Sequence, residues 1–176
     1  MQHFQVKIFV RPAGGVNLEP AIAVFHRWIR ESALPELLID VADYRHVPAG
    51  PGVMLVGHDS HYGLDERKNR LGLLYSRRTA MDGTVGDRLN SAIGAARRAC
   101  ELLTADPAFA GALRFDDGEF EIAVNDRALA PNTADGYLAL EAEVKPVLDA
   151  MWGAGSYDLR SVGAPRELLT VSAIRR

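Results

Sequence analysis

Three histidines and one aspartate gather in a short stretch of the chain, and side chains of these types can bind a metal or move a proton. They are His46, His58, Asp59 and His61. Neutral imidazole and carboxylate suit zinc, iron or manganese, and imidazole also serves as a general base near neutral pH. Both kinds of chemistry require that the side chains converge on one point. Asp40 and Asp43 lie on a neighbouring segment and could add oxygen ligands.

Strand geometry opposes the convergence of the two histidines that are closest in sequence. His58 and His61 are three residues apart, which places them on opposite faces of a strand. They could bind one ion only if Gly57 or Ser60 interrupts the pleat. We therefore predict no metal site, and a metal-dependent or general-base enzyme that uses this histidine-rich meander stays the alternative function.

Two other interpretations fit the same polar residues. They could end strands and bond to the backbone, or they could line a site for a small ligand. A second polar segment, residues 125–133, could contact a ligand or a partner chain, although a loop that ends in an Asn or Thr helix cap also explains it. The residues that we predict to bind a ligand are His46, His58, Asp59, His61, Tyr62, Asp126 and Arg127.

The sequence contains no motif for nucleophilic catalysis or for phosphate binding. Ser60 lies between Asp59 and His61, but neighbours on an extended chain point apart, so the three do not form a triad. Cys100 belongs to an alanine-rich helical pattern, which predicts a small buried residue. Residues 48–52 are rich in glycine, but their two prolines lack an N–H donor and a strand follows instead of a helix. We predict no catalytic residue and no cofactor.

Composition excludes several classes of protein. The chain has 176 residues, of which 48% are hydrophobic and 24% charged, and this is typical of one globular domain that spans residues 1–176. The net charge of −3 and the scattered arginines argue against nucleic-acid binding. No signal peptide is recognisable, and no apolar run reaches the roughly 20 residues of a membrane span. We therefore expect a cytoplasmic protein with no membrane contact.

Apolar periodicity predicts three helices and a mostly antiparallel sheet. The first helix follows a loop at Pro12, Gly14 and Gly15. The second begins at a capping box formed by Thr84 and Asp87. The third contains Pro146, which should kink or divide it. Strands are expected at residues 5–10, 37–44, 53–56 and 71–77, as a hairpin within residues 113–124 around an Asp-Asp-Gly turn, and as a last hairpin within residues 157–174.

The expected order is β-α-β-β-β-α-β-β-α-β-β, an α+β fold of which a ferredoxin-like arrangement could account for part. The apolar runs at residues 53–56 and 71–75 would leave an apolar sheet face if helices cover only one side. We therefore predict a homodimer that forms through sheet surface.

Two segments carry a resemblance to other proteins. RHVPAGPGVMLVGHDSHYGLD, at residues 45–65, and NDRALAPNT, at residues 125–133, resemble segments of an uncharacterised family of bacterial proteins of similar length. The resemblance covers most of the chain and implies a complete, stand-alone protein, but it implies no function. We therefore expect a non-catalytic cytosolic binding or accessory protein, which associates with itself and binds a protein partner or a small ligand.

Overall fold

Apolar residues alternate along strand β1 (Phe4–Val10), and this alternation decides which face of the sheet is covered. In the computed structural model, Phe4, Val6 and Ile8 are at most 1% exposed and belong to the hydrophobic core. Gln5 and Lys7 lie between them, so their side chains point to the opposite face.

Eight strands form one antiparallel sheet in the order β2-β3-β4-β5-β1-β6-β8-β7. The structure describes residues 1–11 and 15–176, so the loop expected at Pro12 and Gly14 lies outside the described residues. Besides β1, the strands are β2 (Leu38–Tyr44), β3 (Gly52–Gly57), β4 (Ser60–Asp65), β5 (Gly72–Arg77), β6 (Phe115–Val124), β7 (Tyr157–Val162) and β8 (Leu169–Arg175).

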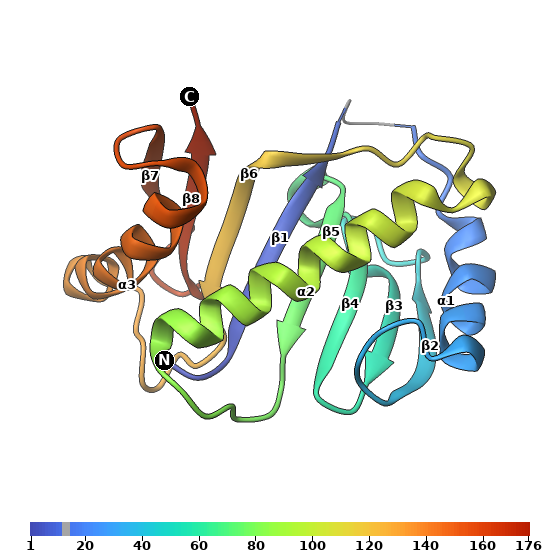
Figure 1. Ribbon diagram of the computed structural model, residues 1–176, viewed down its shortest axis with the longest axis horizontal. Coiled ribbons are helices and arrows are strands. Elements are labelled where there is room, and N and C mark those ends of the chain that lie inside the picture. Colours follow the sequence, from blue (N-terminus) through green and yellow to red (C-terminus); the bar gives the residue numbers. More distant parts are fainter. Residues whose placement is uncertain (12–14) are drawn as a thin grey trace.

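Three helices lie on one face of this sheet: α1 (Glu19–Glu31), α2 (Val85–Ala105) and α3 (Ala134–Trp152). Figure 1 shows α2 running obliquely across the middle of the sheet, with α1 and α3 at its two ends. Short 3-10 helices, η1 (Arg67–Asn69) and η2 (Pro107–Phe109), follow β4 and α2. No described helix is both long enough and apolar enough to cross a membrane. The other face of the sheet, which α1, α2 and α3 leave uncovered, is called the helix-free face below.

The helix ends follow the chemistry of their sequence. Thr84 and Asp87 form the expected capping box at the start of α2, in which each side chain accepts a backbone N–H of the other residue. Cys100 on α2 is buried, as expected. Pro146 lies inside α3 without dividing it into two helices.

The chain builds the sheet as two halves of the same kind. In the first half, β1 and α1 are followed by a meander, β2 to β5, whose last strand returns to pair with β1. In the second half, β6 and α3 are followed by β7 and β8, and β8 returns to pair with β6. Helix α2 connects the halves, which meet where β1 pairs with β6. The β6-α3-β7-β8 half has the split β-α-β arrangement found in ferredoxin-like folds.

The predicted α+β fold, with three helices and a mostly antiparallel sheet, is therefore confirmed, and two local details differ. Residues 60–65 form a full strand, because Tyr62 and Leu64 alternate toward the core. The expected hairpin at Asp116 and Gly118 is instead part of the single strand β6. There the Asp116 carboxylate accepts the N–H of Gly118, and the pairing of β1 with β6 shifts register nearby, which absorbs the turn-forming residues as an irregularity.

Candidate functional site

The histidines of the meander do not converge. His46 lies in the turn between β2 and β3, and His58 lies in the turn between β3 and β4, so they stand at opposite ends of β3. His61 pairs with Val56 within the sheet and points to the helix-free face. Among the described residues, no group of three or more His, Cys, Asp or Glu side chains is placed to hold a metal ion.

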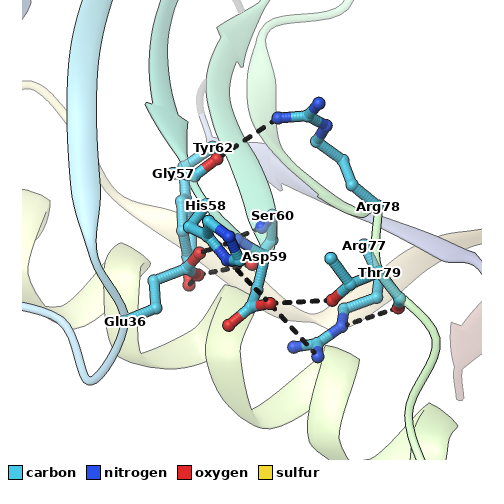
Figure 2. A network of polar contacts seen from close by, with 9 residues as sticks. All are labelled: Glu36, Gly57, His58, Asp59, Ser60, Tyr62, Arg77, Arg78 and Thr79. Carbon is cyan, nitrogen blue, oxygen red and sulfur yellow. Dashed lines mark hydrogen bonds and ion pairs between the residues drawn. The ribbon is translucent and has the colours of Figure 1, made fainter.

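The β3–β4 turn is instead held by Glu36, as Figure 2 shows. Its carboxylate accepts the backbone N–H groups of Asp59 (3.1 Å) and Ser60 (2.9 Å). It also accepts the hydroxyl groups of Ser60 and of Tyr62, the latter at 2.7 Å. Burial, reinforced by this carboxylate, raises the pKa of the Tyr62 hydroxyl above its ordinary value. Glu36 thus satisfies four donors of one turn, which is a structural role.

Asp59 completes the turn on its outer side. Its carboxylate accepts the hydroxyl of Thr79 at 2.8 Å and lies 3.3 Å from Nδ1 of His58. The hydrogen bond from Thr79 lowers the pKa of Asp59, with a smaller contribution from His58. The side chains of His58 and Asp59 thus contact each other at the turn, and the hydroxyl of Tyr62 donates to Glu36 (Figure 2).

His61 differs from these residues because its Nδ1 atom is buried and has no hydrogen-bond partner within the described part of the chain. Burial lowers the pKa of His61, and the positive charge of Arg78 lowers it further.

The second predicted segment is divided between two roles. The carboxylate of Asp126 accepts the backbone N–H of Leu129 at 3.3 Å, so this residue shapes its own loop. Arg127 is exposed and lines a cavity on the helix-free face.

This cavity, called the open-face cavity below, has a volume of about 530 Å³. Strands β1, β4, β5, β6 and β8 supply its floor, and four connecting segments supply its rim. The residues that line it are Gln5, Lys7, Ala49, Asp65, Arg67, Lys68, Leu74, Glu121, Ala123, Arg127, Arg166, Glu167, Leu168 and Thr170. A volume of this size is within the range that small-molecule sites occupy.

A buried ion pair lies in the floor of the open-face cavity. Nζ of Lys7 is 2.5 Å from Oδ2 of Asp65, and these side chains are only 7% and 2% exposed. Oδ1 of Asp65 is also 2.5 Å from Nε of Arg67. Burial lowers the pKa of Lys7 against the opposing effect of Asp65. A buried charge with a perturbed pKa at a cavity is a common feature of binding and catalytic sites.

Loops from the two ends of the sheet meet over this floor. The segment containing η1 leaves the sheet where β1 ends, whereas the β7–β8 turn leaves it where β1 begins. Nζ of Lys68 nevertheless lies 3.3 Å from Oε2 of Glu167, so the two loops bridge the cavity. Both side chains are about half exposed, and ion pairs of this kind contribute little to stability. The bridge can therefore open at low cost.

Comparison of the sequence with known protein families found no match, and comparison with curated proteins found none either. The resemblance to uncharacterised bacterial proteins therefore stays a prediction.

Among the residues that line the cavity, Arg127 was predicted from the sequence, but Lys7, Asp65 and Arg166 were not. One signal was available for Lys7, which stands at a polar position in the otherwise apolar run from Val6 to Val10. A lysine at such a position faces either water or a partner charge.

Proposed function

We propose that this protein is a non-catalytic binding protein that holds a small organic ligand in the open-face cavity. The observation that carries the proposal is the cavity itself, about 530 Å³ in volume, with the buried Lys7–Asp65 ion pair in its floor. Cys100 is buried and unpaired, which suits a reducing compartment, and we further propose that the protein acts in the cytoplasm.

The lining of the cavity supports binding over catalysis. The described lining contains no histidine, cysteine or serine, and Thr170 contributes its only aliphatic hydroxyl. Lys7, the one buried amine, is held by Asp65 at 2.5 Å. Apolar side chains such as Leu74 and Ala123 alternate with polar ones, as expected where a ligand has both an apolar body and a few polar groups.

A ligand screen with a cavity-filling variant tests this function. We expect compounds from a diverse small-molecule library to raise the melting temperature of the wild-type protein, because a ligand that binds only the folded state stabilises it. Leu74→Trp, which places an indole in the cavity, should abolish the effect. Met54→Trp is the matched control, since Met54 is partly exposed on the same face but does not line the cavity. If no compound binds, or if Leu74→Trp binds as well as the wild type, the proposal is wrong.

Self-association is a second candidate function, and the exposed apolar residues around β2 favour it. Leu37, Ile39, Tyr44 and Val47 are 68%, 53%, 39% and 40% exposed, and β2 is an edge strand of the sheet. An edge strand offers unpaired backbone groups to another strand. If Val41 lay opposite Tyr44 of a second copy in an antiparallel pair, Asp40 of each copy would face Arg45 of the other. We propose a two-fold homodimer through this edge, since an isologous pair is the commonest assembly.

The dimer is tested by light scattering at micromolar concentration. We expect twice the monomer mass for the wild type and the monomer mass for Ile39→Lys, which places a charge within the apolar edge. Leu129→Lys is the control, because Leu129 is 82% exposed in a loop remote in sequence from β2. A monomeric wild-type protein would rule the dimer out.

A further inference from the structure

The charges around the open-face cavity are unbalanced toward positive, although the chain as a whole carries a net charge of −3. Five basic side chains line the cavity, against three acidic ones. The imbalance shows that basic residues are concentrated at this place in an otherwise acidic protein. The position of the excess positive charge within the cavity indicates which part of a ligand would contact it.

The floor is already neutralised by its own ion pairs. Asp65 lies 2.5 Å from both Lys7 and Arg67. Glu121 stands directly beside Lys7 in the pairing of β1 with β6, and its charge opposes the lowering of the Lys7 pKa. The floor therefore offers a ligand alternating donors and acceptors, with no excess of either charge.

The excess positive charge lies in the rim, on Arg127 and Arg166. Lys68 is paired with Glu167, but neither arginine has an acidic side chain within 4.0 Å among the described residues. Arg127 lies in the β6–α3 loop and Arg166 in the β7–β8 turn. The side-chain amide of Asn132 donates to the carbonyl of Ala164 at 2.9 Å, so these two loops are joined directly. Both guanidinium groups thus belong to one connected section of the rim.

Guanidinium groups bind carboxylate and phosphate through paired N–H donors, which a neutral or cationic ligand cannot use. Leu74, Ala123 and Leu168 offer apolar surface in the same cavity. We infer that the ligand is a small organic anion whose carboxylate or phosphate group is bound by Arg127 and Arg166, while its uncharged body lies on the floor formed by β1, β5 and β6. This inference rests on the proposed binding function and names the chemical class of the ligand.

Matched pairs of probes test the class of ligand. Benzoate and benzamide have the same shape but differ in charge, and phenyl phosphate and phenol supply the corresponding phosphate pair. Binding is followed by the NMR shifts of the Gln5, Leu74 and Thr170 amides. We expect the anions to bind about tenfold more tightly than their neutral partners. We also expect added salt to weaken the binding of the anions, because salt screens their attraction to the arginines. Whichever anion binds more tightly identifies the preferred group.

Variants of the rim separate this inference from the binding function. Arg127→Gln and Arg166→Gln should each weaken benzoate or phenyl phosphate binding about tenfold, with little effect on the melting temperature because both residues are exposed. Arg30→Gln, an exposed position on α1, should leave binding unchanged. If benzamide and phenol bind as tightly as the anions, or the rim variants bind anions normally, the anionic class is overturned while the binding function stands. If none of the four probes shifts the cavity amides, the anionic class is also overturned, and only the wider library screen then bears on the binding function.

Discussion

Nζ of Lys7 lies 2.5 Å from Oδ2 of Asp65, and both side chains are almost completely buried on the face of the sheet that α1, α2 and α3 leave uncovered. Ion pairs on an uncovered face are usually hydrated. Here the loops containing η1 and the β7–β8 turn approach one another above the pair, as the contact between Lys68 and Glu167 shows. The segment containing η1 also contacts the pair directly, because the carbonyl oxygen of Arg67 accepts from Nζ of Lys7 at 3.4 Å and Nε of Arg67 lies 2.5 Å from Oδ1 of Asp65.

Removing one partner of this pair should be much more harmful than removing both. Asp65→Asn leaves the buried charge of Lys7 without its partner, and we expect a loss of about 3–5 kcal/mol in the free energy of unfolding. The double variant Lys7→Met with Asp65→Leu removes both charges and should lie close to the wild type. Urea unfolding followed by circular dichroism measures both. A loss below about 1 kcal/mol for Asp65→Asn would contradict this expectation.

The lowered pKa of Lys7 predicts how stability depends on pH. In the folded protein, Lys7 releases its proton at a lower pH than the ordinary lysine value of 10.5. Between the folded pKa and 10.5 the unfolded chain therefore binds more protons, and stability rises with pH. Lys7→Met lacks this group, so the stability of the wild type relative to this variant should increase as the pH rises through that window. Unfolding curves of both proteins over this range provide the measurement, and a constant difference would contradict the expectation.

Glu36 should stabilise the β3–β4 turn through the hydrogen bonds that its carboxylate accepts. Ser60 and Tyr62 are residues that are 0% and 2% exposed, and Glu36→Ala leaves their hydroxyl groups without this acceptor. We expect a loss of about 2–3 kcal/mol, because unsatisfied buried donors are costly. Hydrogen exchange should also become faster at the backbone amide of Ser60, whose N–H donates to the Glu36 carboxylate at 2.9 Å. Glu31→Ala, an exposed position at the end of α1, is the control and should change stability by less than about 0.5 kcal/mol. Unchanged exchange at Ser60 would count against this role for Glu36.

The fold could be predicted from the sequence where the pattern is local. The alternation of Val6, Ile8 and Val10 predicted β1, and Thr84 with Asp87 predicted the start of α2, because both signals lie within a few residues. The Asp-Asp-Gly segment was misleading, since the same residues suit a hairpin turn and an irregularity in a strand. Only the pairing of β6 with β1 distinguishes these outcomes.

The candidate site could not be predicted in the same way, because its parts are distant in sequence. Lys7, Asp65 and Arg166 come together only through the strand order β4-β5-β1-β6-β8, which no local pattern encodes. The histidines were candidates because imidazole can bind a metal or transfer a proton. The spacing argument that His58 and His61 lie on opposite faces applies to two residues of one strand, whereas the structure places His61 in β4 and His58 in the preceding turn.

The tight turn before β3 gives a last prediction, with a matched control in α2. Gly52 has a φ of +62°, and a Cβ atom there would overlap the carbonyl oxygen of Leu64 on the neighbouring strand. Gly52→Ala should therefore destabilise the protein by at least about 2 kcal/mol, through backbone strain and steric overlap. Gly94 is exposed in the middle of α2, and a Cβ atom there meets nothing within 4 Å. Gly94→Ala should stabilise the protein by about 0.5–1 kcal/mol, since alanine favours the helix. Thermal unfolding of the two variants should shift the melting temperature in opposite directions, and a shift in the same direction would contradict the account of Gly52, of Gly94 or of both.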